Sequence, residues 1–143
     1  MRVRDVMTRE VDTASATDTI QQVARMMADG DYGVVPVCEG STITGIVTDR
    51  DIAVRGVAQG CGLDTPIERI MSRDVEVVRE DDRIEDVHDR MSAAQVRRLP
   101  VVNAQDELIG IVALADVARS DDEREIGDTV QEISEESSGS RAG

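Results

Sequence analysis

The first half of this 143-residue chain is repeated in its second half. Nine residues recur in the same order at a spacing of 64, and five more recur at a spacing of 65, with the additional residue falling in a polar loop. A repeat of this length predicts two copies of one supersecondary unit. If a pseudo-twofold axis relates the copies, they form a cleft at that axis where both halves can hold a ligand. The repeated pairs are Met7 and Met71, Arg9 and Arg73, Val11 and Val75, Asp18 and Asp82, Ile20 and Ile84, Val23 and Val87, Met27 and Met91, Pro36 and Pro100, Val37 and Val101, then Gly45 and Gly110, Ile46 and Ile111, Val47 and Val112, Asp51 and Asp116, and Ala53 and Ala118.

Each copy is predicted to contain a helix, then a β-hairpin and then a second, short helix. The first helix follows Asp18, with Gln21 placed to complete a capping box and Gly30 to end the helix. Asp82 and Glu85 repeat this capping pattern in the second copy. Apolar stripes with helical spacing support both helices. The stripes are Ile20, Val23, Ala24 and Met27 in the first copy and Ile84, Val87, His88 and Met91 in the second.

Two apolar runs follow each helix and predict the strands of a hairpin. They cover residues 33–38 and 43–47 in the first copy and 96–102 and 108–112 in the second, and each pair is joined by a short polar turn. A short helix is expected to begin near Asp51 and again near Asp116. We therefore expect a first repeat over residues 1–58, a linker over 59–66, a second repeat over 67–119 and an acidic, partly disordered tail over 120–143.

The composition restricts both the core and the partners. The chain has no Phe or Trp, so its core must be aliphatic, and its one aromatic residue, Tyr32, is interpreted as a packing residue beside the first Pro-containing strand. The 16 Lys and Arg residues face 30 Asp and Glu residues, which gives a net charge of -14. This balance argues against nucleic-acid binding, because phosphates require opposing cations.

The sequence predicts a cytoplasmic protein without a membrane partner or a metal centre. It contains no long apolar run and no basic N-terminus followed by an apolar segment. Cys38 and Cys61 lie at non-equivalent positions of the repeat and lack CxxC spacing, so we interpret them as free thiols. With His88 as the only histidine, the chain has neither a clustered Cys/His metal site nor a Ser-His-Asp or Cys-His set.

Three segments of each copy match a known family pattern. They are Asp5-Val6-Met7-Thr8 with Arg69-Ile70-Met71-Ser72, Val35-Pro36-Val37 with Leu99-Pro100-Val101-Val102, and residues 45–51 with 110–116. Together they resemble two cystathionine-β-synthase (CBS) domains over residues 3 to about 119. The chain also resembles short, stand-alone bacterial CBS-pair proteins, some of them stress- or hypoxia-response proteins, that have no enzyme attached.

The resemblance implies both a fold and a function. The fold is an α+β Bateman module of two tandem β-α-β-β-α repeats, related by pseudo-twofold symmetry and packed sheet to sheet. The function is non-catalytic and regulatory, with an adenine nucleotide bound as a ligand between the repeats and no obligatory cofactor. A homodimer and an unidentified protein partner are also implied, so that binding changes dimer geometry or partner affinity.

The family's ligand motif can be carried over to single residues. Asp51 matches the residue that accepts hydrogen bonds from both ribose hydroxyls, and Thr48 matches the hydroxyl that reaches a phosphate. A carboxylate is suited to this role because it can accept from two vicinal hydroxyls at once. In the second copy Asp116 keeps the ribose position, but Ala113 removes the hydroxyl. By the same analogy, Val75, Glu76 and Val77 are candidates for adenine contact.

A basic pair predicts which cleft holds the phosphate. In family members that bind nucleotides, basic residues just before the Pro strand reach the phosphates, and Arg97 and Arg98 match them here. The first copy has Gly33 and Val34 at these positions. We therefore expect one competent site, not two. The arginines favour AMP, ADP, ATP or NAD over the cationic S-adenosylmethionine.

Other interpretations of these residues remain open. Asp51 could serve only to cap the helix that follows it, and the arginines could be solvated strand charges, of which only one enters the cleft because strand neighbours point to opposite faces. A dimeric interaction protein that has lost its ligand is therefore an alternative. A more remote one is an Asp-based phosphatase, because Asp49 and Asp51 follow an apolar strand, although Leu114 replaces Asp49 in the second copy.

Overall fold

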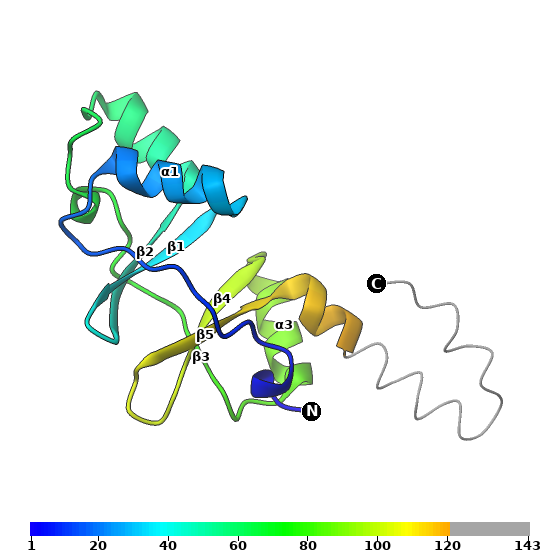
Figure 1. Ribbon diagram of the computed structural model, residues 1–143. Helices are drawn as coiled ribbons and strands as arrows, with labels where there is room; N and C mark the ends of the chain where they lie inside the picture. The colour runs from blue at the N-terminus through cyan, green and yellow to red at the C-terminus, as the bar shows by residue number, and fades with distance from the viewer. Residues whose placement is uncertain (121–143) are drawn as a thin grey trace, which may run out of the picture.

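The computed structural model describes residues 1–120, and the expected acidic tail, apart from its first residue, lies outside the described residues. Figure 1 shows two units of similar build, one formed mainly by the first half of the chain and one by the second. Each unit has a β-hairpin with a helix packed beside it. The α+β class and the tandem arrangement predicted from the repeat are confirmed.

The first unit contains one long helix and a two-stranded antiparallel sheet. Helix α1 covers Ile20–Gly30, and strands β1 and β2 cover Val34–Glu39 and Thr42–Thr48. The short helix expected near residue 51 begins slightly earlier, as α2 at Asp49–Asp51, and continues as a π-helical turn over Ile52–Gly56 and a 3-10 turn over Val57–Gln59.

The second unit repeats this order with a three-stranded sheet. Strand β3 covers Val78–Arg79, helix α3 covers Ile84–Ala94, and strands β4 and β5 cover Arg98–Val102 and Leu108–Ala113. Residues 114–120 are helical. The third strand has a counterpart in the first unit, where Ala14 forms a single parallel bridge to Val37. Both sheets therefore share one plan.

The predicted cap of the first helix was wrong by one residue. Thr19 is the N-cap, its hydroxyl accepts from the amide of Gln22, and the Gln22 side chain accepts from the amide of Thr19. Asp18 instead closes the preceding turn, where its carboxylate accepts from the amide of Ser15 at 2.9 Å. Asp18 therefore sets the direction in which the chain enters the helix.

The predicted cap of the second helix was also wrong. Arg83 occupies the N-cap of α3 and makes no capping bond with its side chain. Asp82 closes the same turn as its counterpart in the first repeat, since its carboxylate accepts from the amide of Arg79 at 2.8 Å. The repeated Asp therefore marks a turn that the two copies share, while only the first copy has a side-chain cap.

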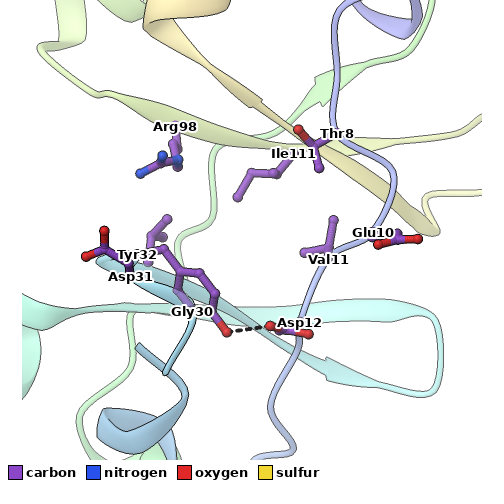
Figure 2. Close-up of a pocket in the computed structure, with 10 residues that line it drawn as sticks. Thr8, Glu10, Val11, Asp12, Gly30, Asp31, Tyr32, Arg98 and Ile111 are labelled. Carbon is purple, nitrogen blue, oxygen red and sulfur yellow. Dashed lines mark hydrogen bonds between the residues drawn. The ribbon is translucent and has the colours of Figure 1, made fainter. Parts of the chain in front are cut away.

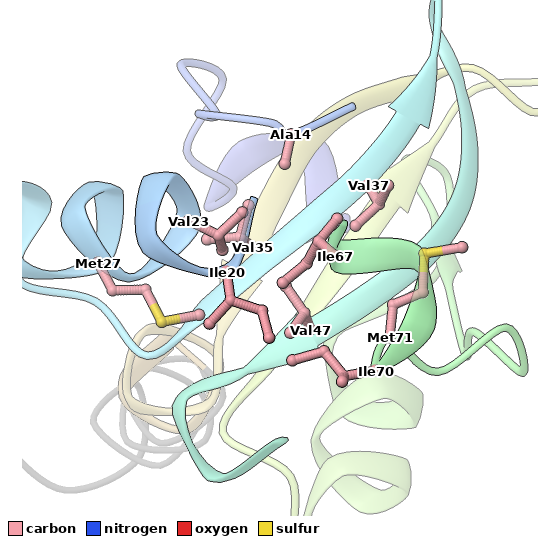
Figure 3. Close-up of a cluster of buried hydrophobic side chains, with 10 residues drawn as sticks. All are labelled: Ala14, Ile20, Val23, Met27, Val35, Val37, Val47, Ile67, Ile70 and Met71. Carbon is pink, nitrogen blue, oxygen red and sulfur yellow. The ribbon is translucent and has the colours of Figure 1, made fainter. Parts of the chain in front are cut away.

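The short turn at the start of each repeat, here called its leading turn, packs into the hydrophobic core of the other repeat. The 3-10 turn at Val3–Asp5 places Val3, which is fully buried, in the core of the second unit. The equivalent turn at Ile67–Arg69 places Ile67, also fully buried, in the core of the first unit. Figure 3 shows Ile67, Ile70 and Met71 packed among side chains of α1, β1 and β2. Neither core is complete without the other half of the chain.

Backbone bonds join a segment of each repeat to the sheet of the other repeat. Thr8 pairs with Ile111 of β5 through two bonds of 2.8 and 2.9 Å, and Ser72 pairs with Ile46 of β2 through two bonds of the same lengths. The hairpin tips also meet, because the amide of Leu108 donates to the carbonyl of Ser41. This packing of sheet against sheet creates the clefts between the repeats.

The repeated Met and Gly residues are paired in space. A Cβ atom at Gly45 would collide with the Met71 side chain, and one at Gly110 would collide with Met7. Each Met therefore lies over a Gly of the other repeat, which explains why both residue types recur in both copies.

Candidate ligand-binding clefts

The larger cleft between the repeats, here called the major cleft, has a volume of about 730 Å³. Residues from both halves of the chain form its walls, which place the end of β2 opposite the start of β4. This size falls in the range of about 300–1,000 Å³ that is typical of small-molecule sites. The lining residues are Gly33, Val34, Ile46, Thr48, Asp49, Arg50, Asp74, Glu76, Gln95, Val96, Arg97, Arg98 and Leu99.

Half of the residues proposed from the sequence line this cleft. Thr48, Glu76, Arg97 and Arg98 are among its walls. The other four, which are Asp51, Val75, Val77 and Asp116, are half-buried and lie outside the lining. Sequence reasoning did not select Arg50 or Gln95, which also line the cleft.

Thr48 and Asp51 form a reciprocal capping box at the start of α2. The Asp51 carboxylate accepts from the amide of Thr48 at 2.9 Å, and the Thr48 hydroxyl accepts from the amide of Asp51 at 3.1 Å. The capping role that the sequence left open for Asp51 is therefore present. The box fixes the Thr48 side chain at the cleft wall, and the capping bond uses one carboxylate oxygen of Asp51, Oδ2.

Arg97 and Arg98 are exposed, and both line the major cleft. The expectation that only one of them would enter rested on strand alternation. Arg97 precedes β4, so the alternation does not apply to it, and its carbonyl accepts from the amide of Leu114 at 2.7 Å. Within residues 1–120, neither guanidinium has a hydrogen bond or ion pair with another side chain.

One of the acidic residues of the major cleft is neutralised by a cation outside it. Glu76 forms an ion pair with Arg90 of α3 at 3.0 Å, and the same guanidinium nitrogen donates to the carbonyl of Val77. Asp49 accepts from the amide of Arg50 at 2.8 Å. Asp74 also lines the cleft, so of its three carboxylates only Glu76 has an ion pair among the described residues, and Arg50, Arg97 and Arg98 face the other two.

A second, smaller cleft, here called the minor cleft, lies at the equivalent position on the other side of the axis. Its volume is about 210 Å³. Glu10, Asp12 and Ile111 of its lining correspond by the repeat to Asp74, Glu76 and Ile46 of the major cleft. The complete lining is Thr8, Glu10, Val11, Asp12, Gly30, Asp31, Tyr32, Val34, Arg98 and Ile111.

The side chain of Tyr32 occupies part of the minor cleft (Figure 2). Figure 2 shows its ring inside the cleft with its hydroxyl bonded to Asp12, and the donor to acceptor distance is 2.7 Å. Burial is the first cause, and the hydrogen bond and charge of Asp12 the next, that raise the pKa of Tyr32 to about 12. The sequence analysis treated Tyr32 only as a packing residue. The signal that could have revealed it was the replacement by Val96 in the second copy.

The second ribose candidate lies in a different environment from the first. Asp116 forms an ion pair with Arg119 at 2.9 Å, within the same helix. Ala113, at the end of β5, has no hydroxyl with which to cap that helix. The equivalent of the Thr48–Asp51 box is therefore missing from the second repeat.

Three further features limit the chemistry of the described part of the chain. No group of three or more His, Cys, Asp or Glu side chains in residues 1–120 could hold a metal ion. No described helix is long and apolar enough to cross a bilayer. Cys38 and Cys61 are free thiols, and burial raises the pKa of Cys38.

The chain matches known proteins over most of its length. The sequence profile of the CBS domain matches residues 3–56 and 67–123. The CBS domain-containing protein YhcV of Bacillus subtilis is 40% identical over 138 residues, which cover 96% of this chain and 90% of YhcV. Hypoxic response protein 1 of Mycobacterium tuberculosis is 34% identical over 118 residues, which cover 81% of this chain and 82% of that protein.

Solved structures give the same result. Hypoxic response protein I with two coordinated zinc ions superposes with a TM-score of 0.74 at 32% identity, covering 84% of this chain and 98% of that one. The CBS domain pair of protein MJ0100, in complex with 5′-methylthioadenosine and S-adenosyl-L-methionine, superposes with a TM-score of 0.74 at 28% identity, covering 87% and 98%. This chain belongs to the CBS-domain family, as a tandem pair of CBS domains.

Proposed function

We propose that this CBS pair is a non-catalytic sensor that binds one adenine-containing ligand, with a phosphate group, in the major cleft. AMP, ADP, ATP and NAD are the ligands considered. The observation that carries the proposal is the position of Arg97 and Arg98, two guanidinium groups without side-chain partners in residues 1–120, at the wall of a cleft of about 730 Å³.

The chemistry of the cleft suits a phosphate group. A guanidinium group can donate two parallel hydrogen bonds to phosphate oxygens. Thr48 adds a hydroxyl on the facing wall, which can donate to a third oxygen because its capping bond uses the hydroxyl only as an acceptor. Hydrogen bonds to charged groups contribute about 1.5–3 kcal/mol each, so loss of one changes the affinity by roughly one to two decades.

The adenosine part of the ligand is proposed from the family. The related pair of MJ0100 was solved in complex with two adenosine derivatives, 5′-methylthioadenosine and S-adenosyl-L-methionine. In this chain the ribose would contact Asp51, and the base would lie near Val75, Glu76 and Val77. The S-adenosyl compound is disfavoured in the major cleft because its sulfonium cation would face two arginines.

The output of the sensor is proposed to be a change in a homodimer or in its affinity for a protein partner. A ligand can bias such an equilibrium only by binding one state more tightly than the other. In this chain the leading turns are exchanged between cores, so a ligand that shifts one repeat also moves part of the other core.

A calorimetric titration tests the proposal. Protein freed of co-purified nucleotide is titrated with AMP, ATP and NAD, beside the variants Asp51→Ala and Arg98→Ala. We expect about one ligand per chain for the wild type and a loss of roughly one to two decades in affinity for each variant. Arg25→Ala is the matched control, since Arg25 is an exposed arginine of α1 that lines neither cleft.

Two results would contradict the proposal. Absence of saturable binding by any of the three nucleotides would favour a CBS pair that acts as an interaction protein without a ligand. Equal affinity in the wild type, Asp51→Ala and Arg98→Ala would place the ligand elsewhere.

A further inference from the structure

The two clefts occupy equivalent positions but differ in volume. The major cleft is one cavity of about 730 Å³. On the other side of the axis, a cavity of about 210 Å³ and a hollow of about 380 Å³ lie next to each other. Tyr32, Asp12 and Gly30 line both of these spaces. The Tyr32–Asp12 pair therefore lies between the minor cleft and this hollow, and the other residues of the hollow, which are Thr13, Met26 and Asp29, have no counterparts in the wall of the major cleft.

The repeat identifies what replaces this boundary in the major cleft. Tyr32 corresponds to Val96, a much smaller side chain that lines the major cleft without dividing it. Asp12 corresponds to Glu76, which is paired with Arg90 and not with an aromatic hydroxyl. The ring that occupies part of the minor cleft is therefore a side chain that the other repeat lacks.

A second substitution between the repeats accompanies the first. A Cβ atom at Gly30 would overlap the ring of Tyr32, whereas the equivalent position of the second repeat is Ala94. Gly30 is thus the residue that leaves room for the ring. Gly30, at the end of α1, and Tyr32 therefore act together, because both residues are needed to place the ring in the cleft.

The remaining walls determine which ligand the ring keeps out. Glu10, Asp12 and Asp31 line the minor cleft against one cation, Arg98. An anionic nucleotide is therefore disfavoured by charge, and a cationic adenosine derivative such as S-adenosylmethionine fits the charge of the walls.

We propose that Tyr32 is an intramolecular plug that keeps the minor cleft closed to cationic adenosine derivatives, so that the chain binds one adenine-containing ligand and not two. The inference rests on the proposed function for the ligand class. It goes further because it attributes the number of ligands bound per chain to one side chain, Tyr32, which Asp12 holds and for which Gly30 leaves room.

The test is a calorimetric titration with S-adenosylmethionine and, separately, with AMP. The Tyr32→Val variant places in the first repeat the residue that the second repeat already has. We expect S-adenosylmethionine to bind this variant at least tenfold more tightly than it binds the wild type, while its affinity for AMP is unchanged. Tyr32→Phe is the matched control, because it keeps the ring in place and removes only the hydroxyl, so it should resemble the wild type in S-adenosylmethionine binding.

Each outcome either supports or overturns the proposal that Tyr32 closes the minor cleft. Equal binding of S-adenosylmethionine to the wild type and Tyr32→Val, including no binding to either, overturns the plug. New binding of S-adenosylmethionine by the variant supports the plug even if AMP binds neither protein, and in that case only the proposed function of the major cleft fails. If Tyr32→Val does not fold, the double variant Ala94→Gly with Val96→Tyr tests the same idea in reverse, because it supplies both the ring and the space for it. Loss of AMP binding supports the plug, and unchanged AMP binding contradicts it.

Discussion

The major and minor clefts are built from equivalent positions of two repeats, and they differ in a few side chains. The major cleft has Thr48, Val96 and two arginines of β4 and its entry, and it forms a continuous space of about 730 Å³. The minor cleft has Tyr32 at the position of Val96, shares Val34 and Arg98 with the major cleft, and has a volume of about 210 Å³. The comparison teaches that a duplicated fold can keep the same backbone arrangement in both copies while a side chain of the protein itself occupies one of the two ligand clefts.

The largest expected effect concerns the framework that both clefts share. Ile67 in the core of the first unit and Ile84 in the core of the second are both fully buried. Replacing either by Ala should lower the free energy of unfolding by about 2–5 kcal/mol. Because the leading turns are exchanged, we expect one cooperative transition in chemical denaturation that both variants shift. Two separate transitions, each sensitive to one substitution, would show that the halves fold independently.

A smaller effect is expected from the glycine beneath the plug. Gly30→Ala should cost about 1–3 kcal/mol of stability, since the new methyl group overlaps the Tyr32 ring. In the double variant Gly30→Ala with Tyr32→Val the overlap is absent, and the pair reproduces the Ala94 and Val96 of the second repeat. A double-mutant cycle by thermal denaturation should therefore show strong coupling. Additive effects of the two substitutions would rule out the Gly30–Tyr32 contact.

The capping difference predicts a change of about 1 kcal/mol. Thr48→Ala removes the N-cap hydroxyl of α2 and should lower the free energy of unfolding by about that amount. Ala113→Thr supplies a hydroxyl at the equivalent position of the second repeat and should raise the stability by a similar amount. Denaturant titration measures both, and equal stability of Thr48→Ala and the wild type would mean that the box contributes nothing.

The smallest effect is the titration of the plug itself. The pKa of Tyr32 is raised from 10.0 to about 12, first by burial and then by Asp12. The fold therefore favours the neutral phenol, so this contribution to stability is complete below pH 10 and is lost as the pH rises from about 10 to about 12. Tyr32 is the only aromatic residue, and the absorbance of its phenolate reports it without interference. Asp12→Asn should shift the titration toward 10, and ionisation of the wild type near 10 would contradict the hydrogen bond between Tyr32 and Asp12.

Much of the fold could be predicted from the repeat, because two aligned copies of the same apolar pattern define the same helix and hairpin twice. The exchange of Val3 and Ile67 between cores could not be predicted. These residues are equivalent in the repeat, so each fits either core equally well, and the sequence does not indicate which connection the chain takes.

The site could be predicted less completely. Thr48, Arg97 and Arg98 were placed at the cleft by a motif, and the structure brings them together there. Tyr32 was missed because its role depends on the space above Gly30 and on the distance to Asp12, which only the folded chain defines. The same limit applies to Arg50 and Gln95, which carry no motif.

The most direct test of the central claim is to observe which cleft a nucleotide occupies. In methyl NMR spectra of valine-labelled protein, Val96 reports on the major cleft and Val11 on the minor cleft. On titration with AMP, the account predicts saturable shifts of the Val96 methyl signals while the Val11 signals stay in place. Shifts of Val11 without Val96, or of neither residue, would contradict a single phosphate-binding site in the major cleft.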